Sequence, residues 1–74
     1  MNLTELQLNQ DAYIVSINES PTTNQLYEIG VLPGSKIKLM FKSDLVNPVF
    51  KVDDVFISID EKLLSLIEVR LSKS

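Results

Sequence analysis

The sequence predicts a mainly β protein: a small barrel of about five strands, with one short α-helix and a short C-terminal helical turn. The chain has 74 residues, enough for a single domain, 1–74, with a small core. Turn-forming residues separate short segments in which apolar and polar residues alternate, as in half-buried strands. Closing such strands into a barrel removes the exposed edges that a flat sheet leaves. The expected strands are residues 11–18, 36–42, 49–53, 55–60 and 67–71.

The N-terminal segment is expected to form a short apolar turn, for which Thr4 is a candidate cap. Its apolar residues are Leu3, Leu6 and Leu8. The first strand, residues 11–18, has apolar residues on both faces, which is typical of a barrel strand whose outer side is partly covered. One face is expected to carry Ala12, Ile14 and Ser16, and the other Tyr13, Val15 and Ile17.

A short helix is predicted over residues 22–29. Ser20 is the expected N-cap, and Pro21 suits the first helical position because proline lacks the N–H that would be unpaired there. Leu26 and Ile29 fall on one face of this helix, three residues apart. We therefore expect both side chains to close one mouth of the barrel.

The exit from this helix carries both glycines of the chain. Gly30 fits the position after the C-cap, where a left-handed residue ends a helix. Pro33 and Gly34 have the positions that a type II turn beginning at Leu32 prefers. The strand over residues 36–42 follows directly. These demands of the backbone are sufficient to explain Gly30, Pro33 and Gly34.

The first basic residues of the chain appear in this second strand. Ile37, Leu39 and Phe41 are expected to point inward, and the opposite face carries Lys36, Lys38, Met40 and Lys42. Two interpretations of these lysines stay open. They solvate the outer face of the strand or guard its edge, or they form a basic stripe that meets an acidic partner surface.

The remaining elements follow from turn residues. Residues 43–48 connect two strands, and Asp53-Asp54 forms a hairpin turn. Asp60 is the expected cap of a helical turn before the last strand. Phe56 lies on the polar side of its strand, either packed under a neighbouring segment or exposed for a partner. By strand count, the architecture is an SH3-like barrel.

The composition excludes several functions. The chain has no histidine and no cysteine, so no thiolate or imidazole catalysis is available, and we expect no enzyme and no cofactor. The net charge of −3 argues against nucleic-acid binding. No signal-peptide pattern and no apolar run of membrane-spanning length occurs, so we expect a cytoplasmic protein without membrane insertion. Any iron would have to bind carboxylates, and we predict no tight Fe(II) site.

One sequence signature covers the helix exit, the Pro-Gly turn and the following strand: Leu26-Tyr27-Glu28-Ile29-Gly30-Val31-Leu32-Pro33-Gly34-Ser35-Lys36-Ile37. It resembles the FeoA family, small cytosolic proteins of bacterial ferrous iron transport. The spacing continues without gaps through three weaker segments, including a turn that ends at Pro48. These segments are Leu45-Val46-Asn47-Pro48, Ile57-Ser58-Ile59 and Leu66-Ile67-Glu68-Val69.

The chain also departs from that family's pattern. Gln25 replaces an arginine before the helical leucine, and Val46-Asn47 replaces Gly-Asp in the later turn. Asp60 stands where the family has an arginine, which reverses a charge. If that arginine meets a partner, the partner surface differs here. If it only begins a solvated helix, aspartate is the better cap.

The resemblance implies a non-enzymatic accessory protein that binds the cytosolic portion of the membrane Fe(II) transporter FeoB and modulates iron uptake. A few exposed apolar or aromatic residues usually anchor such a contact. The candidate contact residues are Leu26, Tyr27, Leu32, Lys36, Lys38 and Met40. Core packing is the alternative for Leu26, Tyr27 and Leu32. The alternative function is a self-associating structural or regulatory module, a homo-oligomer without a transporter partner, or a repressor-type SH3-like domain.

Overall fold

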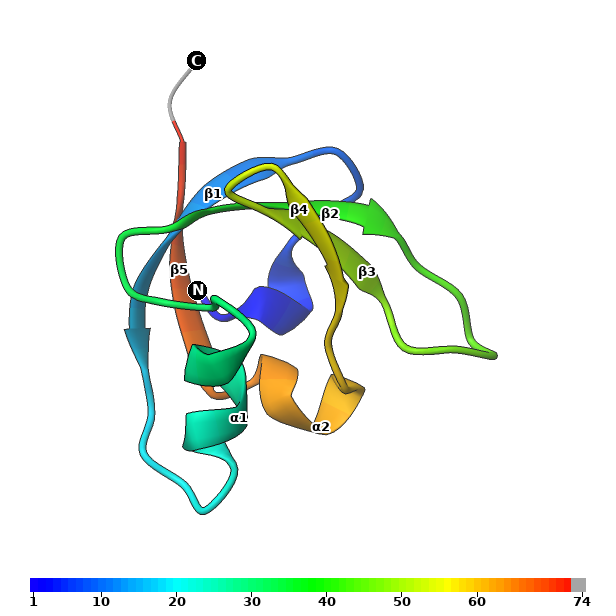
Figure 1. Cartoon of the computed structure of the whole chain (residues 1–74). Coiled ribbons are helices and arrows are strands. Elements are labelled where there is room, and N and C mark those ends of the chain that lie inside the picture. The colour runs from blue at the N-terminus through cyan, green and yellow to red at the C-terminus, as the bar shows by residue number, and fades with distance from the viewer. Residues whose placement is uncertain (73–74) are drawn as a thin grey trace.

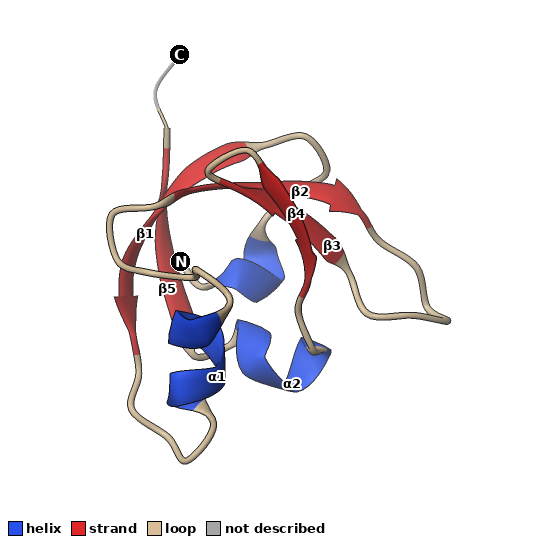
Figure 2. Cartoon of the chain, viewed as in Figure 1, coloured by secondary structure: helices blue, strands red, loops and turns tan. Residues whose placement is uncertain are grey.

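A computed structural model describes residues 1–72 as one curved antiparallel sheet with short helical segments on its concave side (Figures 1 and 2). The strand order is β4-β3-β2-β1-β5. The elements are η1 (Leu3–Glu5), β1 (Asp11–Ile17), α1 (Thr23–Glu28), β2 (Lys36–Phe41), β3 (Val49–Val52), β4 (Val55–Ser58), α2 (Glu61–Leu64) and β5 (Ile67–Leu71). The predicted mainly β class is confirmed, with five strands and short helices.

The core lies between the sheet and the helical segments, and every strand except β4 contributes residues that are fully buried. Phe50 on β3 is its largest such side chain. Leu3 of η1 and Leu26 of α1 fill the core from the helical side, and Figure 2 shows these two helical segments beneath the sheet. Burying apolar area of this kind is the main favourable term for so short a chain. Its other buried apolar residues are Leu6, Ala12, Ile14, Ile17, Val31, Ile37, Leu39, Val52, Ile59, Leu64, Ile67 and Val69.

Two irregularities in strand pairing change which side chains face inward. The pairing of β1 with β5 shifts register between Ile14 and Ser16, so Ile17 is buried and Ser16 is exposed, the reverse of the expected alternation. The pairing of β2 with β3 shifts after Leu39, and Phe41 is half exposed rather than inward. A bulge inserts one residue and so reverses the alternation beyond it.

The caps of the helical segments differ in part from the predictions. Asn2, not Thr4, caps η1, because its side chain accepts the Thr4 N–H at 2.9 Å. The expectation that Ser20 is the N-cap and Pro21 the first helical residue is wrong: α1 begins at Thr23, and Thr22 is its N-cap residue. The Ser20 hydroxyl instead accepts the Thr22 N–H at 3.2 Å in the turn before the helix. Asp60 caps α2 as expected and accepts the Lys62 N–H at 2.9 Å.

The two edge strands of the sheet, β5 and β4, differ in what pairs with their outer sides. The N-terminus covers β5: Asn2 bridges Glu68, and the Val69 N–H donates to the Met1 carbonyl at 2.8 Å. Along the described chain, no second strand pairs with the outer side of β4. The expectation that closure removes every edge is therefore wrong for β4, because the sheet curls without a β4–β5 ladder.

Candidate partner-binding surface

The exit from α1 is held by hydrogen bonds that fix the exposed side chains around it. Gly30 has a φ of +92°, and its N–H donates to the Tyr27 carbonyl at 3.1 Å. Gly34 also has a φ of +92°, and the Ser35 N–H donates to the Leu32 carbonyl at 3.0 Å, which completes the predicted type II turn. Both glycines therefore have the left-handed backbone that the sequence predicts.

The same turn is tied to β1. The Gly34 N–H donates to the Ile14 carbonyl at 2.7 Å, and the Ile14 N–H donates to the Ser35 carbonyl at 2.9 Å. These two bonds extend the β1–β2 pairing beyond the strand end. Leu32, at the start of the turn, is thus presented by a backbone that is bonded on both sides, so contact through it has a small ordering cost.

The structure separates the apolar candidates of this region into buried and exposed residues. Leu26 is 1% exposed and belongs to the core, so it is not available for contact. Tyr27 is 39% exposed and Leu32 is 44% exposed. Ile29, expected in the barrel mouth, is 46% exposed, and that expectation is wrong. We call Tyr27, Ile29 and Leu32 the helix-exit surface.

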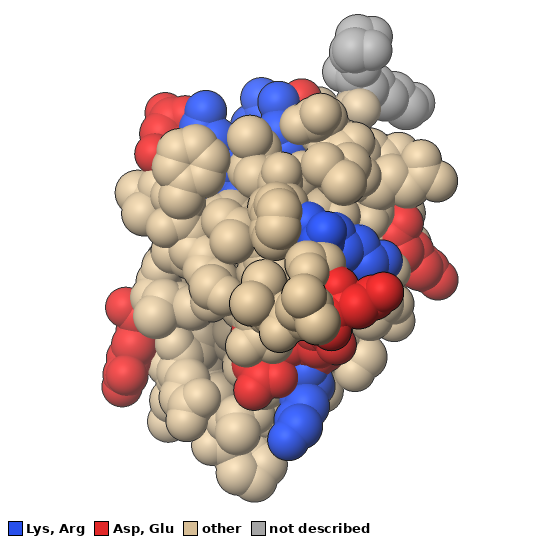
Figure 3. Space-filling model, turned by 90° about the vertical axis from the view of Figure 1, so that its right-hand side faces the viewer, with Lys and Arg blue, Asp and Glu red and all other residues tan. Residues whose placement is uncertain are grey.

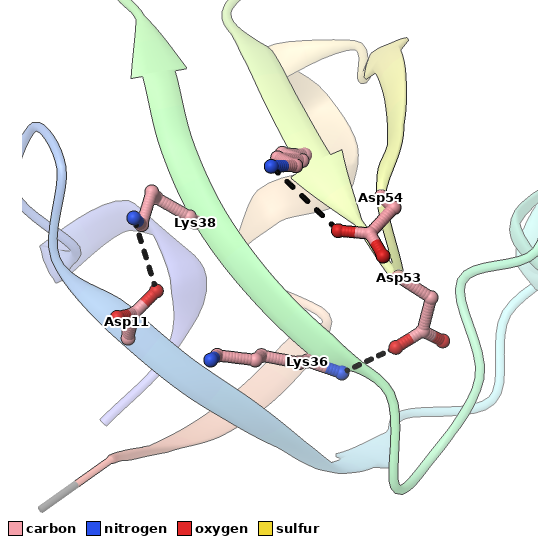
Figure 4. Close-up of a pocket in the computed structure, with 6 residues that line it drawn as sticks. Asp11, Lys36, Lys38, Asp53 and Asp54 are labelled. Atoms are coloured by element: carbon pink, nitrogen blue, oxygen red, sulfur yellow. Dashed lines mark hydrogen bonds and ion pairs between the residues drawn. The ribbon is translucent and has the colours of Figure 1, made fainter.

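The lysines of β2 lie in a depression on the outer side of the sheet, with a volume of about 270 Å³ (Figure 4). It is lined by Asp11, Lys36, Lys38, Lys51, Asp53 and Asp54, and we call it the charged depression. The aspartates come from β1 and from the β3–β4 turn, so they flank the central lysines (Figure 4). Met40 is half-buried and lies outside the lining of this depression.

Aspartates of the same chain already pair with two of these lysines. Lys38 Nζ is 3.5 Å from Asp11 Oδ1, and Lys51 Nζ is 3.6 Å from Asp54 Oδ1. Asp53 accepts the backbone N–H of Lys36 at 3.1 Å, but the Lys36 ammonium forms no ion pair with any described residue. Of the lysines in the charged depression, Lys36 is therefore the one whose charge is most open to a partner.

Lys51 was not identified from the sequence. It is the cross-strand neighbour of Lys38 in the β2–β3 register, so pairing two predicted strands would have placed it beside the lysine stripe. On the other side Tyr13, 40% exposed, pairs with Lys36. In the sequence, the buried Ser35 alone separates the Pro-Gly turn from Lys36 of the charged depression.

The described residues offer little for metal or membrane chemistry. Within residues 1–72, no group of three His, Cys, Asp or Glu side chains is placed to hold a metal ion. No helix in this part of the chain has the length and apolar character needed to cross a bilayer. The region thus offers exposed apolar residues at the exit from α1 and a mixed-charge depression on the outer side of the sheet.

Comparison with known proteins identifies the family. The FeoA domain matches residues 1–71. The iron(II) transport protein A of Clostridium thermocellum is 26% identical, with a TM-score of 0.87, and the match covers 96% of this chain and 45% of that one. No curated protein sequence matches the chain significantly.

Two further solved structures, both below 25% identity, show the same fold. A FeoA-like protein of Clostridium acetobutylicum is 16% identical, with a TM-score of 0.89 over 100% of this chain and 88% of that one. The zinc complex of Stenotrophomonas maltophilia FeoA, described as a procaryotic SH3 domain protein, is 18% identical, with a TM-score of 0.80 over 95% and 89%. The chain belongs to the FeoA family of non-catalytic, SH3-like proteins associated with ferrous iron transport.

Proposed function

We propose that this protein binds the cytosolic portion of a FeoB-type membrane transporter and modulates Fe(II) uptake from the cytoplasmic side. The observation that carries this proposal is the exposure of Tyr27 and Leu32 on a backbone fixed by the Gly30 and Pro33-Gly34 turns. An aromatic and an aliphatic side chain held in place are the usual anchors of a protein contact.

The lysines of the charged depression indicate the charge that a partner surface should carry. Lys36 follows the turn and carries an ammonium without an ion-pair partner in residues 1–72, so an acidic group of the transporter is the matching contact. Lys38 and Lys51, already paired with aspartates, contribute less charge to such a contact. Charge at the margin of an interface acts mainly on the rate of association and on the choice of partner.

The test is capture of the purified protein on membranes that contain or lack a FeoB-type transporter. Tyr27→Ala and Leu32→Ala should each reduce transporter-dependent capture. Leu45→Ala is the matched control, because Leu45 is 91% exposed on the β2–β3 loop, which projects from the opposite side of the molecule from α1 (Figure 1). Equal capture with and without transporter would refute the proposal.

A self-associating module is the competing function, and sedimentation of the free chain separates the two. A monomer at micromolar concentration, together with transporter-dependent capture, supports the proposal. Stable oligomers that form through Tyr27 and Leu32 would favour the competing function, since the same residues cannot then contact the transporter.

A further inference from the structure

The outer side of β4 is the unpaired edge of the sheet. The N-terminus occupies the opposite edge, where Asn2 bridges Glu68 and Met1 accepts the Val69 N–H. Over residues 1–72, β4 pairs only with β3. An edge strand left open presents backbone donors and acceptors to any extended chain.

The register shows which backbone groups point outward. Asp53 and Asp54 form a two-residue turn with φ values of 47° and 70°, and Val52 pairs with Val55 directly beside it. The pair that closes such a hairpin exchanges both of its hydrogen bonds. Alternation then turns the N–H and C=O groups of Phe56 and Ser58 away from β3. The bond of 3.1 Å from the Ile59 N–H to the Pro48 carbonyl continues the same alternation.

The strand lacks the features that usually block pairing at an edge. Val55–Ser58 contains no proline and no charged residue, and its pairing with β3 is continuous. Phe56 is 62% exposed, and Lys51 Nζ lies 5.9 Å from its ring centroid. Beside Ser58 lies a shallow depression whose apolar lining includes Leu45, Val46 and Val49.

Carboxylates border this apolar strip at both ends. Phe56 and Ser58 take alternate positions on the outer face of β4. Asp54, in the turn before the strand, lies 3.6 Å from Lys51 Nζ, and Asp60, after the strand, accepts the Lys62 N–H at 2.9 Å. Asp44 and Glu61 line the depression beside Ser58. Figure 3 shows the side toward which the β2–β3 loop projects: uncharged atoms cover most of it, and both acidic and basic groups lie among and around them.

This charge pattern argues against a second copy of the chain. Antiparallel pairing of two β4 strands through their outward groups sets Phe56 opposite Ser58 of the other copy. The same register sets Asp54 opposite Asp60 twice, and like charges directly opposite each other destabilise a strand pair. A segment that carries basic residues at those two places removes the repulsion and pairs with the carboxylates.

We propose that β4 accepts an extended segment of another protein as a sixth strand, apolar in its middle and with Lys or Arg at both ends. Backbone hydrogen bonds to Phe56 and Ser58 hold the segment, and its ends face Asp54 and Asp60. In such strand addition, the backbone supplies affinity and the side chains supply specificity. This surface is separate from the helix-exit surface, and the inference does not depend on transporter binding.

The test uses the full chain and a synthetic heptapeptide, Lys-Thr-Val-Thr-Val-Thr-Lys, with blocked ends. Amide hydrogen exchange at Phe56 and Ser58 is measured by NMR with and without peptide. At a peptide concentration ten times its Kd, exchange at both amides should slow by about tenfold, because they exchange only while the peptide is dissociated. The charge-reversed peptide Glu-Thr-Val-Thr-Val-Thr-Glu should protect neither amide.

Variants of the protein locate the effect. Ser58→Pro removes one outward N–H at an edge position where proline is tolerated, and it should weaken peptide binding. Asp54→Asn should also weaken binding, whereas Glu19→Gln, which changes an exposed acid away from β4, should not. Three results each overturn the inference: no protection of Phe56 and Ser58 by the basic peptide, equal protection by the acidic peptide, or concentration-dependent protection without peptide, which would identify a second copy.

Discussion

The backbone N–H of Val31 donates to the carbonyl oxygen of Leu26 at 2.9 Å, spanning the left-handed Gly30. With the Gly30 N–H bonded to Tyr27, this is the pair of bonds of a Schellman motif. Both Leu26 and Val31 are buried and belong to the same apolar core cluster.

Substitution at Gly30 should act through the backbone alone. A methyl group at Gly30 would meet open space apart from the adjoining chain, but the φ of +92° opposes an L residue. Gly30→Ala should therefore lower the free energy of unfolding by about 1–2 kcal/mol, measured by urea denaturation. D-alanine at the same position, introduced by chemical synthesis, prefers positive φ and should raise stability instead. If both substitutions destabilise equally, a steric clash rather than φ is the cause.

Truncation of the two leucines of this region should separate core from surface. Leu26→Ala leaves a cavity in the core and should cost about 2–5 kcal/mol of unfolding free energy. Leu32 is 44% exposed, and Leu32→Ala should cost clearly less. Thermal and urea unfolding of both variants measure the difference. A Leu32→Ala cost equal to that of Leu26→Ala would mean that Leu32 packs as core.

The β3–β4 turn should gain stability from glycine at its second position only. Asp53 and Asp54 both have positive φ, and Asp-Gly is a preferred pair for such a turn. Asp54→Gly loses a surface ion pair of small value and should raise the unfolding free energy by about 0.5–1 kcal/mol. Asp53→Gly is the matched control, because it also removes the acceptor of the Lys36 N–H and should not stabilise.

Charge reversal should distinguish two neighbouring lysines of the charged depression. If the transporter contact uses this side, Lys36→Glu should slow association by about threefold to tenfold at low salt, because its charge is unpaired within residues 1–72. Lys38→Glu should slow it less, since Asp11 already lies 3.5 Å from Lys38. Binding kinetics with the transporter's cytosolic portion at two salt concentrations measure both. Equal effects that are insensitive to salt would contradict this prediction.

Local signals in the sequence were sufficient for much of the fold. Gly30, Gly34 and the Asp53-Asp54 turn each demand a particular backbone within a few residues, and the structure has that backbone at all of them. Ile29 shows the limit of predicting burial from helical periodicity. The Gly30 turn redirects the chain and brings Val31 to Leu26, so Val31 fills the core position and Ile29 stays outside.

Features that depend on pairing between distant strands could not be predicted. The bulges that expose Ser16 and Phe41 are set by register against β5 and β3, which a single strand does not encode. The β4 edge is open because the first residues of the chain, and not β4, lie against the outer side of β5. For the candidate surface, exposure separated Tyr27 and Leu32 from Leu26, and exposure at a short helix is decided by what packs above it.

The pairing of β1 with β5 has a consequence for biosynthesis. β1 lies between β2 and β5, and Met1 and Asn2 rest on β5. Residues 67–71 are synthesised after the other described strands, so Met1 and Asn2 have no β5 to rest on until that strand has been made. While that strand is inside the exit tunnel, β1 has one bare side and the core lacks Ile67 and Val69. The sheet is therefore completed only after residues 67–71 have emerged. Contacts so distant in sequence also slow folding.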